Sequence, residues 1–151
     1  VVYTRQLLNS LVRDGYMTAE EKDTLSVKRF TWFMQTKLGK RMQHAAKEGT
    51  LHREQQFMLG IPASEIMPEL PSEETVLMQG IIDAYFEEEG ELVLVDYKTD
   101  YIERGQGEKL AERYRIQMMY YARALEQLTG KTVREKIIYS FSLGEEIILN
   151  E

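Results

Sequence analysis

The sequence predicts an α/β domain in which helices are followed by three strands, a long helix and one or two further strands. Two observations carry this prediction. The apolar run from Leu92 to Val95 is typical of a strand that is covered on both faces. Residues 108–130 carry apolar side chains at spacings of three and four, which is typical of an amphipathic helix of about six turns. With 151 residues we expect one domain, with N-terminal helices over 1–48 and a core over 49–151.

Helical pattern fills the N-terminal part of the sequence. Thr18 and Glu21 have the spacing of a capping box, which marks a helix start. We expect interruptions near residues 24–26 and at Gly39, because glycine disfavours a helix interior. Gly49 should end the helical region.

The remaining segments predict strands and turns. Residues 62–72 hold all three prolines and should form a loop with one helical turn at 64–67. Glu89 and Gly90 should join two strands into a hairpin. Gly130 should end the long helix, and Gly144 should turn the chain. The expected strands cover residues 50–61, 75–87, 91–100, 133–143 and 145–150.

Composition limits the possible functions. The formal charge of −6 has the wrong sign for a domain that holds nucleic acid by its own phosphate contacts, but it allows a catalytic domain to which another module delivers the polymer. The absence of cysteine excludes disulfides, thiolate zinc sites and an iron–sulfur cluster within the chain. Only oxygen and imidazole ligands remain for a metal, which favours hard cations.

No run of about 18 apolar residues and no charged-then-apolar leader occurs, so we expect no membrane span and a cytoplasmic location. The chain starts at Val1 on helical pattern, and we expect it to be a fragment of a longer protein.

Charged residues follow the most hydrophobic strand at once. Asp96, Lys98 and Asp100 alternate along the strand and therefore share one face. With a two-residue hairpin loop, Asp83 of the preceding strand stands directly opposite Asp96, whereas a three-residue loop puts the two on opposite faces. Two carboxylates about 5 Å apart repel by about 3 kcal/mol at an effective dielectric near 20, so the fold must compensate the pair.

Two interpretations account for these charges. Both carboxylates can bind a divalent cation whose other ligands are water, with Lys98 beside the reacting group. Alternatively, Asp96, Lys98 and Asp100 form a solvated, salt-bridged strand end worth at most about 1 kcal/mol. In either case Lys98 lies past the buried run and is expected near the surface.

One stripe of the long helix should face the sheet. Gln117 is its misfit, because a core-facing glutamine needs hydrogen-bond partners, and the Tyr121 hydroxyl lies one turn later. The alternative is a satisfied core glutamine beside a packing tyrosine. The stripe comprises Leu110, Tyr114, Gln117, Tyr121, Leu125 and Leu128.

These residues, in this order, resemble the nuclease domain of RecB-type helicase-nucleases, a branch of the PD-(D/E)XK superfamily, and most closely that of AddA-type subunits. The resemblance covers residues 38–143 and depends on "GIID" at 80–83, "VDYKT" at 95–99 and "QMMYY" at 117–121, with "REQQF" at 53–57 on the preceding strand. It implies a restriction-endonuclease-like mixed sheet with an αβββαβ core. Glu54 of "REQQF" is assigned no role.

The resemblance also implies a site. Asp83 and Asp96 would bind Mg²⁺, or Mn²⁺ as a substitute, with the Tyr97 carbonyl as a further ligand. Lys98 would position or activate the attacking water. The implied catalytic residues are Asp83, Asp96, Lys98, Gln117 and Tyr121.

The implied function is DNA exonuclease activity in double-strand break repair and recombination. The implied partners are DNA, helicase domains of the same parent chain and a second helicase/nuclease subunit, with no membrane. A non-catalytic module of the same fold, which docks subunits or gates a DNA channel, is the alternative. A restriction-type or phage nuclease is a weaker one, because the Gln-x-x-x-Tyr helix is typical of the RecB-like branch.

The family usually carries an active-site histidine on a helix well before the first strand. Neither histidine of this chain fits that context, because His44 lies too close to the strand and His52 opens it. The resemblance therefore implies that the histidine lies upstream of the fragment and that the isolated chain lacks part of the site.

Overall fold

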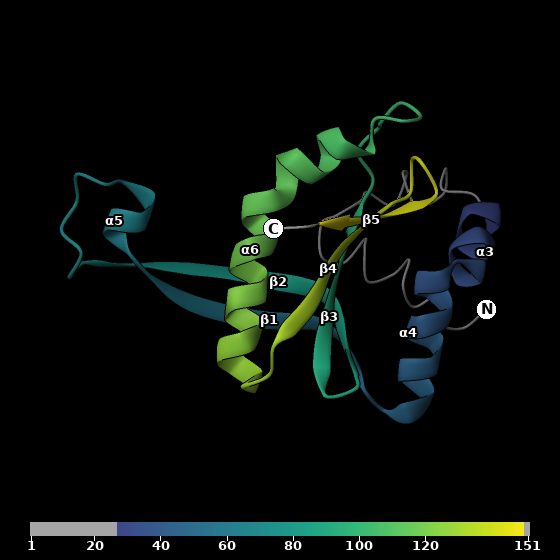
Figure 1. Cartoon of the computed structure of the whole chain (residues 1–151), viewed down its shortest axis with the longest axis horizontal. Coiled ribbons are helices and arrows are strands. Elements are labelled where there is room, and N and C mark those ends of the chain that lie inside the picture. The colour runs from purple at the N-terminus through teal and green to yellow at the C-terminus, as the bar shows by residue number, and fades with distance from the viewer. Residues whose placement is uncertain (1–26, 150–151) are drawn as a thin grey trace.

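The computed structural model describes residues 27–149, in which a five-stranded sheet lies between helices on its two faces (Figure 1). The helices are α3 (Val27–Gln35), α4 (Lys37–Glu48), α5 (Ala63–Ile66) and α6 (Gly107–Thr129). The strands are β1 (Leu51–Pro62), β2 (Thr75–Glu88), β3 (Glu91–Lys98), β4 (Val133–Ser140) and β5 (Glu145–Leu149). The expected capping box of Thr18 and Glu21, and the break near 24–26, lie outside the described residues.

The sheet is mixed, with strand order β1-β2-β3-β4-β5. Consecutive strands are antiparallel except β3 and β4, which are parallel and are connected through α6. The α/β class and the mixed sheet are as the sequence predicts. None of the helices within residues 27–149 is long and apolar enough to cross a membrane.

Two apolar layers cover the sheet, one on each face. Phe30 and Phe33 of α3 pack with Tyr139 and Phe141 on one face. On the other face, Leu110 and Leu125 of α6 pack against β3 and β4. Side chains of β3 alternate between the two layers, which explains why Leu92–Val95 is apolar throughout and buried.

The hairpin has the register that a two-residue loop predicts. Glu89 and Gly90 both have positive φ, 52° and 80°, as a type I′ turn requires. Ala84 stands opposite Val95, and the next residues outward from the turn are Asp83 and Asp96. The register therefore brings the two aspartates to neighbouring strands at the same level.

The predicted helix break at Gly39 is wrong. The chain breaks at Thr36, whose hydroxyl accepts a hydrogen bond from the Gly39 amide and caps α4. Gly39 lies inside α4, and a Cβ there would collide with the Phe33 carbonyl oxygen. The glycine thus permits close packing of α3 on α4 rather than ending a helix.

Three further expectations differ from the structure, namely the ends of two strands and the orientation of Leu128. Strand β3 ends at Lys98 and β4 at Ser140, two and three residues earlier than expected, and a turn over residues 141–144 follows β4. Leu128 does not face the sheet, since it is 56% exposed near the end of α6.

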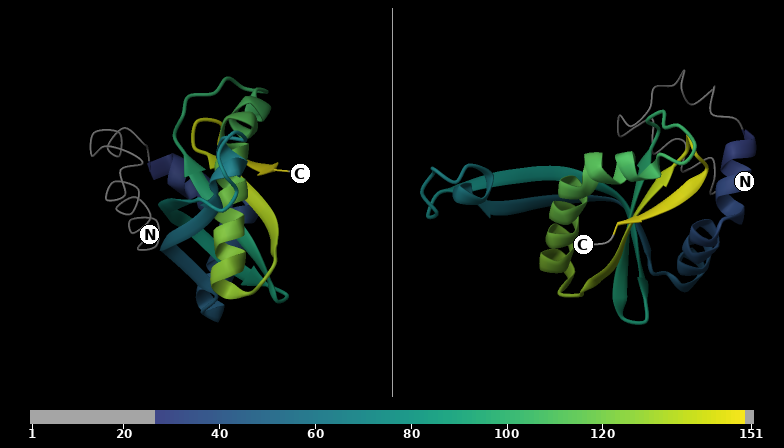
Figure 2. Two further views of the ribbon diagram at one scale, coloured as in Figure 1. Left: turned by 90° about the vertical axis from the view of Figure 1, so that its left-hand side faces the viewer. Right: turned by 45° about the horizontal axis from the view of Figure 1, so that its top comes forward.

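The outer halves of β1 and β2 project from the sheet as an arm that ends at α5 (Figure 2). Leu59 and Ile61 on one side of the arm pack on Tyr120 and Ala124 of α6. The arm is therefore held against the same helix that covers the sheet.

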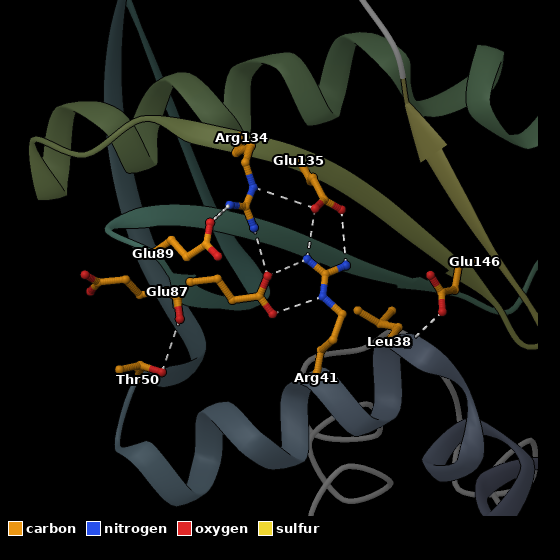
Figure 3. A network of polar contacts seen from close by, with 9 residues as sticks. Leu38, Arg41, Thr50, Glu87, Glu89, Arg134, Glu135 and Glu146 are labelled. Carbon is orange, nitrogen blue, oxygen red and sulfur yellow. Dashed lines mark hydrogen bonds and ion pairs between the residues drawn. The ribbon is translucent and has the colours of Figure 1, made fainter.

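An ion-pair network ties α4 to the hairpin end of the sheet (Figure 3). Arg41 donates to both carboxylate oxygens of Glu88, at 3.0 and 2.8 Å, and to those of Glu135, at 3.2 and 2.9 Å. Its side chain is 16% exposed. Hydrogen bonds from Arg41 lower the pKa of Glu88, so this interaction stabilises the fold above the carboxyl's ordinary pKa and is lost as pH falls through the lowered value.

Replacing Arg41 with methionine should lower the free energy of unfolding by about 2 kcal/mol, because two half-buried carboxylates lose their shared cation. Urea unfolding at pH 7 measures the change. Arg115→Met is the matched control, since Arg115 makes exposed pairs with Glu108 and Glu112, and its effect should stay within about 0.5 kcal/mol. Equal losses for the two variants would contradict this account.

Candidate functional site

Two buried aspartates lie where β2 and β3 separate. Asp83 is 5% exposed and Asp96 is 1% exposed. The ladder between the strands ends at Ala84 and Val95, and beyond it the Tyr97 amide donates to Asp83 Oδ2 at 2.8 Å. A side chain thus replaces the backbone acceptor at this point, and the carboxylate is fixed in the gap between the strands.

The ladder on the other side of Asp83 is interrupted as well. Arg53 pairs with Ala84 and Gln55 with Ile82, so the register keeps Glu54 opposite Asp83, but the ladder skips this position and Glu54 has a φ of 56°. A non-glycine residue at positive φ costs of order 1 kcal/mol and is typical of a bulge or a functional site. Glu54 Oε1 is a buried carboxylate oxygen. Both ladders are therefore open at the level of Asp83.

The buried carboxylate of Asp96 can accept more hydrogen bonds than it receives. Neither of its buried carboxylate oxygens receives a hydrogen bond of good geometry from an N–H or hydroxyl group, although a carboxyl–carboxyl hydrogen bond with Asp83 contributes to the raised pKa of Asp83. Its Oδ2 lies 2.9 Å from Lys98 Nζ, which is close enough for an ion pair. Buried carboxylate oxygens normally have donors or a cation, so a further cation would satisfy this site.

Lys98 extends the site to α6. Its ammonium donates to Gln117 Oε1 at 3.2 Å, and Gln117 Nε2 donates to the Tyr121 hydroxyl at 3.1 Å. The expectation that Lys98 lies near the surface is wrong, because it is 7% exposed. It is covered by α6, which crosses this end of the sheet.

Tyr114 is a contact that the sequence analysis assigned only to packing. Lys98 Nζ lies 3.9 Å from the centre of its ring, which is the geometry of a cation–π interaction. The Tyr114 hydroxyl donates to Asp100 Oδ2 at 2.8 Å, and Arg113 donates to the same oxygen at 2.7 Å. The signal in the sequence was the spacing of Tyr114 and Gln117, which places both on one side of the helix.

The pKa shifts distinguish Asp83 from Asp100. Burial, followed by the charge of Asp96, raises the pKa of Asp83 well above its ordinary value. Burial alone would raise the pKa of Asp100, but hydrogen bonds from Tyr114 and Arg113 lower it. Asp100 therefore belongs to a salt-bridged strand end, whereas Asp83 and Asp96 form a strained pair.

The raised pKa of Asp83 predicts an unusual pH dependence of stability. The folded state holds the Asp83 proton more tightly than the unfolded state, so its contribution to stability is full below pH 3.8 and is lost as pH rises through the raised pKa. Metal-free unfolding measured at increasing pH from pH 4 should show this loss in the difference between the parent chain and Asp83→Asn. A difference that does not change with pH would contradict the assigned pKa direction.

The donor set fits a hard cation with few protein ligands. Among residues 27–149, no group of three or more histidine, aspartate or glutamate side chains is arranged to hold a metal. Two carboxylates remain, together with backbone carbonyls and water, and Mg²⁺ is commonly held in this way. The buried oxygens of Asp96, whose one nearby cation is Lys98 in the described part of the chain, are consistent with such an ion.

The histidines lie away from this set. His44 is exposed on α4, and the His52 ring stacks on Tyr85 with their centres 4.7 Å apart. No histidine precedes His44 in the sequence. The structure thus brings together all five residues named as catalytic, and neither histidine belongs to the group.

Comparison with known proteins gives consistent similarities. A model of the PD-(D/E)XK nuclease superfamily matches residues 4–147.

Three relatives each carry the name of an ATP-dependent helicase/nuclease subunit. The one from Acetivibrio thermocellus is 44% identical over 138 residues, which are 89% of this chain and 11% of the relative. The one from Ruminiclostridium cellulolyticum is 42% identical over 139 residues, with the same shares of 89% and 11%. The one from Lachnoclostridium phytofermentans is 39% identical over 176 residues, with 95% of this chain and 13% of the relative covered. The chain thus spans 11–13% of the length of these relatives.

Proposed function

The chain belongs to the PD-(D/E)XK nuclease superfamily, and from this premise we propose that it hydrolyses DNA phosphodiester bonds with a divalent cation. The observation that carries the proposal is the buried Asp83 and Asp96 pair with Lys98 Nζ 2.9 Å from Asp96. A structural ion pair with Lys98 needs only one carboxylate. A second carboxylate on the neighbouring strand destabilises the fold by charge repulsion unless a bound cation compensates it.

Asp83 and Asp96 would hold Mg²⁺ or Mn²⁺, with the Tyr97 carbonyl as a further ligand. When bound, the ion supplies Lewis acidity toward a phosphoryl oxygen and lowers the pKa of water. The Tyr97 amide holds the Asp83 carboxylate in place by donating to its Oδ2. Asp83 must lose its proton before it can act as a ligand, because only the ionised carboxylate binds the cation well.

Lys98 is the proposed catalytic cation. Its ammonium would orient the attacking water and stabilise the negative charge that develops on the phosphate. Gln117 fixes the ammonium from one side, and the Tyr114 ring lies against it on another. Gln117 and Tyr121 would also contact the DNA strand, since both are joined in one hydrogen-bonded pair next to Lys98.

The names of the relatives extend the proposal. We place the chain in a helicase/nuclease assembly, where helicase domains of a longer polypeptide deliver DNA and a second helicase/nuclease subunit takes part in double-strand break repair and recombination. The net charge of −6 supports delivery by other modules, because the chain has few phosphate contacts of its own.

A second candidate is a non-catalytic module that docks subunits or gates a DNA channel. The absence of a histidine before α4 favours it for this fragment, because the family's usual active-site histidine is not supplied by these residues. The intact Asp83, Asp96 and Lys98 set favours the enzyme.

The two candidates differ in one experiment. End-labelled single-stranded DNA is incubated with Mg²⁺ and the longer polypeptide that carries this chain, beside its Asp96→Ala form. The nuclease proposal expects cleavage that requires Mg²⁺ and is lost in the variant. Equal degradation by both forms would place hydrolysis elsewhere in the polypeptide.

A further inference from the structure

Two hollows of about 320 and 290 Å³ lie beside the end of β4 and the end of β3, respectively, and share Arg29, Ser142 and Leu143 in their walls. Thr99 lines the second hollow and directly follows Lys98, so this hollow reaches the residue next to the proposed catalytic lysine. We refer to the two hollows together as the basic-aromatic groove.

Three segments that are distant in sequence are joined to form this groove. The β4–β5 turn lies between α3 and the segment that links β3 to α6 (Figures 1 and 2). Trp32 Nε1 of α3 donates to the Gly144 carbonyl of the turn at 2.9 Å. The Ile102 amide donates to Ser142 Oγ at 3.1 Å, which fastens the linking segment to the other side of the turn. The groove is therefore fixed by contacts on both walls.

The charge of the groove opposes that of the chain. Lys28, Arg29 and Arg104 line it, and no acidic side chain is among its lining residues in the described part of the chain. None of these three cations takes part in an ion pair within residues 27–149. For a chain with 25 acidic and 19 basic residues, a basic surface that forms no ion pair with any other described residue indicates an anionic ligand.

Two aromatic side chains in the groove are unusually exposed. Trp32 is 58% exposed and Tyr101 is 82% exposed. Aromatic faces between cations are the pattern that binds unpaired nucleotides, because bases stack on the rings while phosphates meet the charges. A duplex hides its base faces and cannot use these rings.

We propose that the basic-aromatic groove binds an unpaired segment of the DNA strand next to the bond that is cut. Bases stack on Trp32 and Tyr101, and phosphates contact Lys28, Arg29 and Arg104. The proposal rests on the proposed nuclease function and adds to it the path of the strand across the end of β3 and β4.

Trp32 is the only tryptophan of the chain, so its fluorescence reports on the groove directly. The chain is titrated with a short oligothymidylate in buffer with a chelator, which prevents hydrolysis. Fluorescence should be quenched to saturation, and log K should fall with log salt at a slope of about −2, as three phosphate contacts to a single strand give. A hairpin duplex should bind at least about fivefold more weakly, because it offers no base to stack.

Tyr101→Ala should weaken the oligonucleotide at least about fivefold, the lower end of the range for losing one stacked base. Arg29→Ala should weaken it and reduce the salt slope by about 0.7, the share of one phosphate contact. Lys47→Ala, which removes the same charge from the exposed end of α4, is the matched control and should leave affinity and slope unchanged. Circular dichroism of each variant establishes that it is folded.

The outcomes separate this proposal from the nuclease proposal. Hydrolysis by the longer polypeptide with no quenching of Trp32 would overturn the groove alone. Quenching without hydrolysis would overturn the nuclease function and leave the groove. Equal affinity for duplex and single strand, or equal effects of Arg29→Ala and Lys47→Ala, would overturn the groove as a single-strand site. Shielding of Trp32 from acrylamide in the longer polypeptide, with no response to oligonucleotide, would instead assign the groove to a domain contact.

Discussion

Replacing Lys98 with methionine should lower the rate of DNA hydrolysis at least about 100-fold, the usual scale for a positioned catalytic group. Methionine keeps an unbranched side chain against the Tyr114 ring but removes the charge next to Asp96. Hydrolysis is measured at saturating DNA and Mg²⁺ with the longer polypeptide that carries this chain, so that the loss is read in kcat. Under the proposed helicase/nuclease assembly, DNA unwinding should survive in this variant, since unwinding would use a different site.

The stability of the Lys98 variant requires its own measurement, because the lysine is buried rather than exposed. Removing the charge leaves Asp96 without its nearby cation, which should lower the metal-free free energy of unfolding by about 2 kcal/mol. Mg²⁺ should restore part of this loss by compensating Asp96. Arg113→Met is the control, since it removes a cation from Asp100 only, and hydrolysis should stay within about threefold of the parent. Near-normal hydrolysis by Lys98→Met would return Lys98 to a structural ion pair.

Replacing Asp83 with asparagine should abolish most of the stabilisation that Mg²⁺ or Mn²⁺ gives to the chain. A cation that binds only the folded state raises the melting temperature by mass action, and the effect disappears when a ligand is lost. Without metal, the same variant should be at least as stable as the parent at pH values above the raised pKa of Asp83, because the neutral amide is not repelled by Asp96. The substitution should thus remove the stabilisation by metal without lowering the metal-free stability, and this combination makes the prediction specific.

Asp100→Asn is the matched control for the Asp83 variant. It removes the same charge near Lys98, but Asp100 is held by Arg113 and Tyr114 and lies outside the proposed ligand pair. Its response to Mg²⁺ should equal that of the parent. An unchanged metal response in Asp83→Asn, or equal losses in both variants, would count against the carboxylate pair as the metal site.

The placement of Asp83 opposite Asp96 could be predicted from the sequence because it depends on the local chemistry of the turn. Glu89 and Gly90 fit a two-residue turn, and a two-residue turn allows only one register between its strands. The position of Gln117 on the inner side of α6 followed from helical spacing in the same way. Local rules were sufficient wherever a neighbour along the chain fixed the geometry.

The errors arose where packing between separate elements decides the structure. Gly39 has the sequence context of a helix breaker, but the Phe33 carbonyl occupies the space a side chain would need, and only tertiary packing reveals this. Lys98 was expected at the surface because the strand ends there, yet α6 covers it. The positive φ of Glu54 could not be predicted from residue type, since nothing in the side chain demands it.

The central claim is that Asp83 and Asp96 together hold one divalent cation. Crystals of the chain grown with Mn²⁺, with anomalous diffraction recorded near the manganese edge, test it most directly. The account predicts an anomalous peak within about 2.0–2.4 Å of a carboxylate oxygen from each aspartate, on the side toward Lys98. Manganese bound elsewhere in the chain, with no peak between the two aspartates, would contradict it.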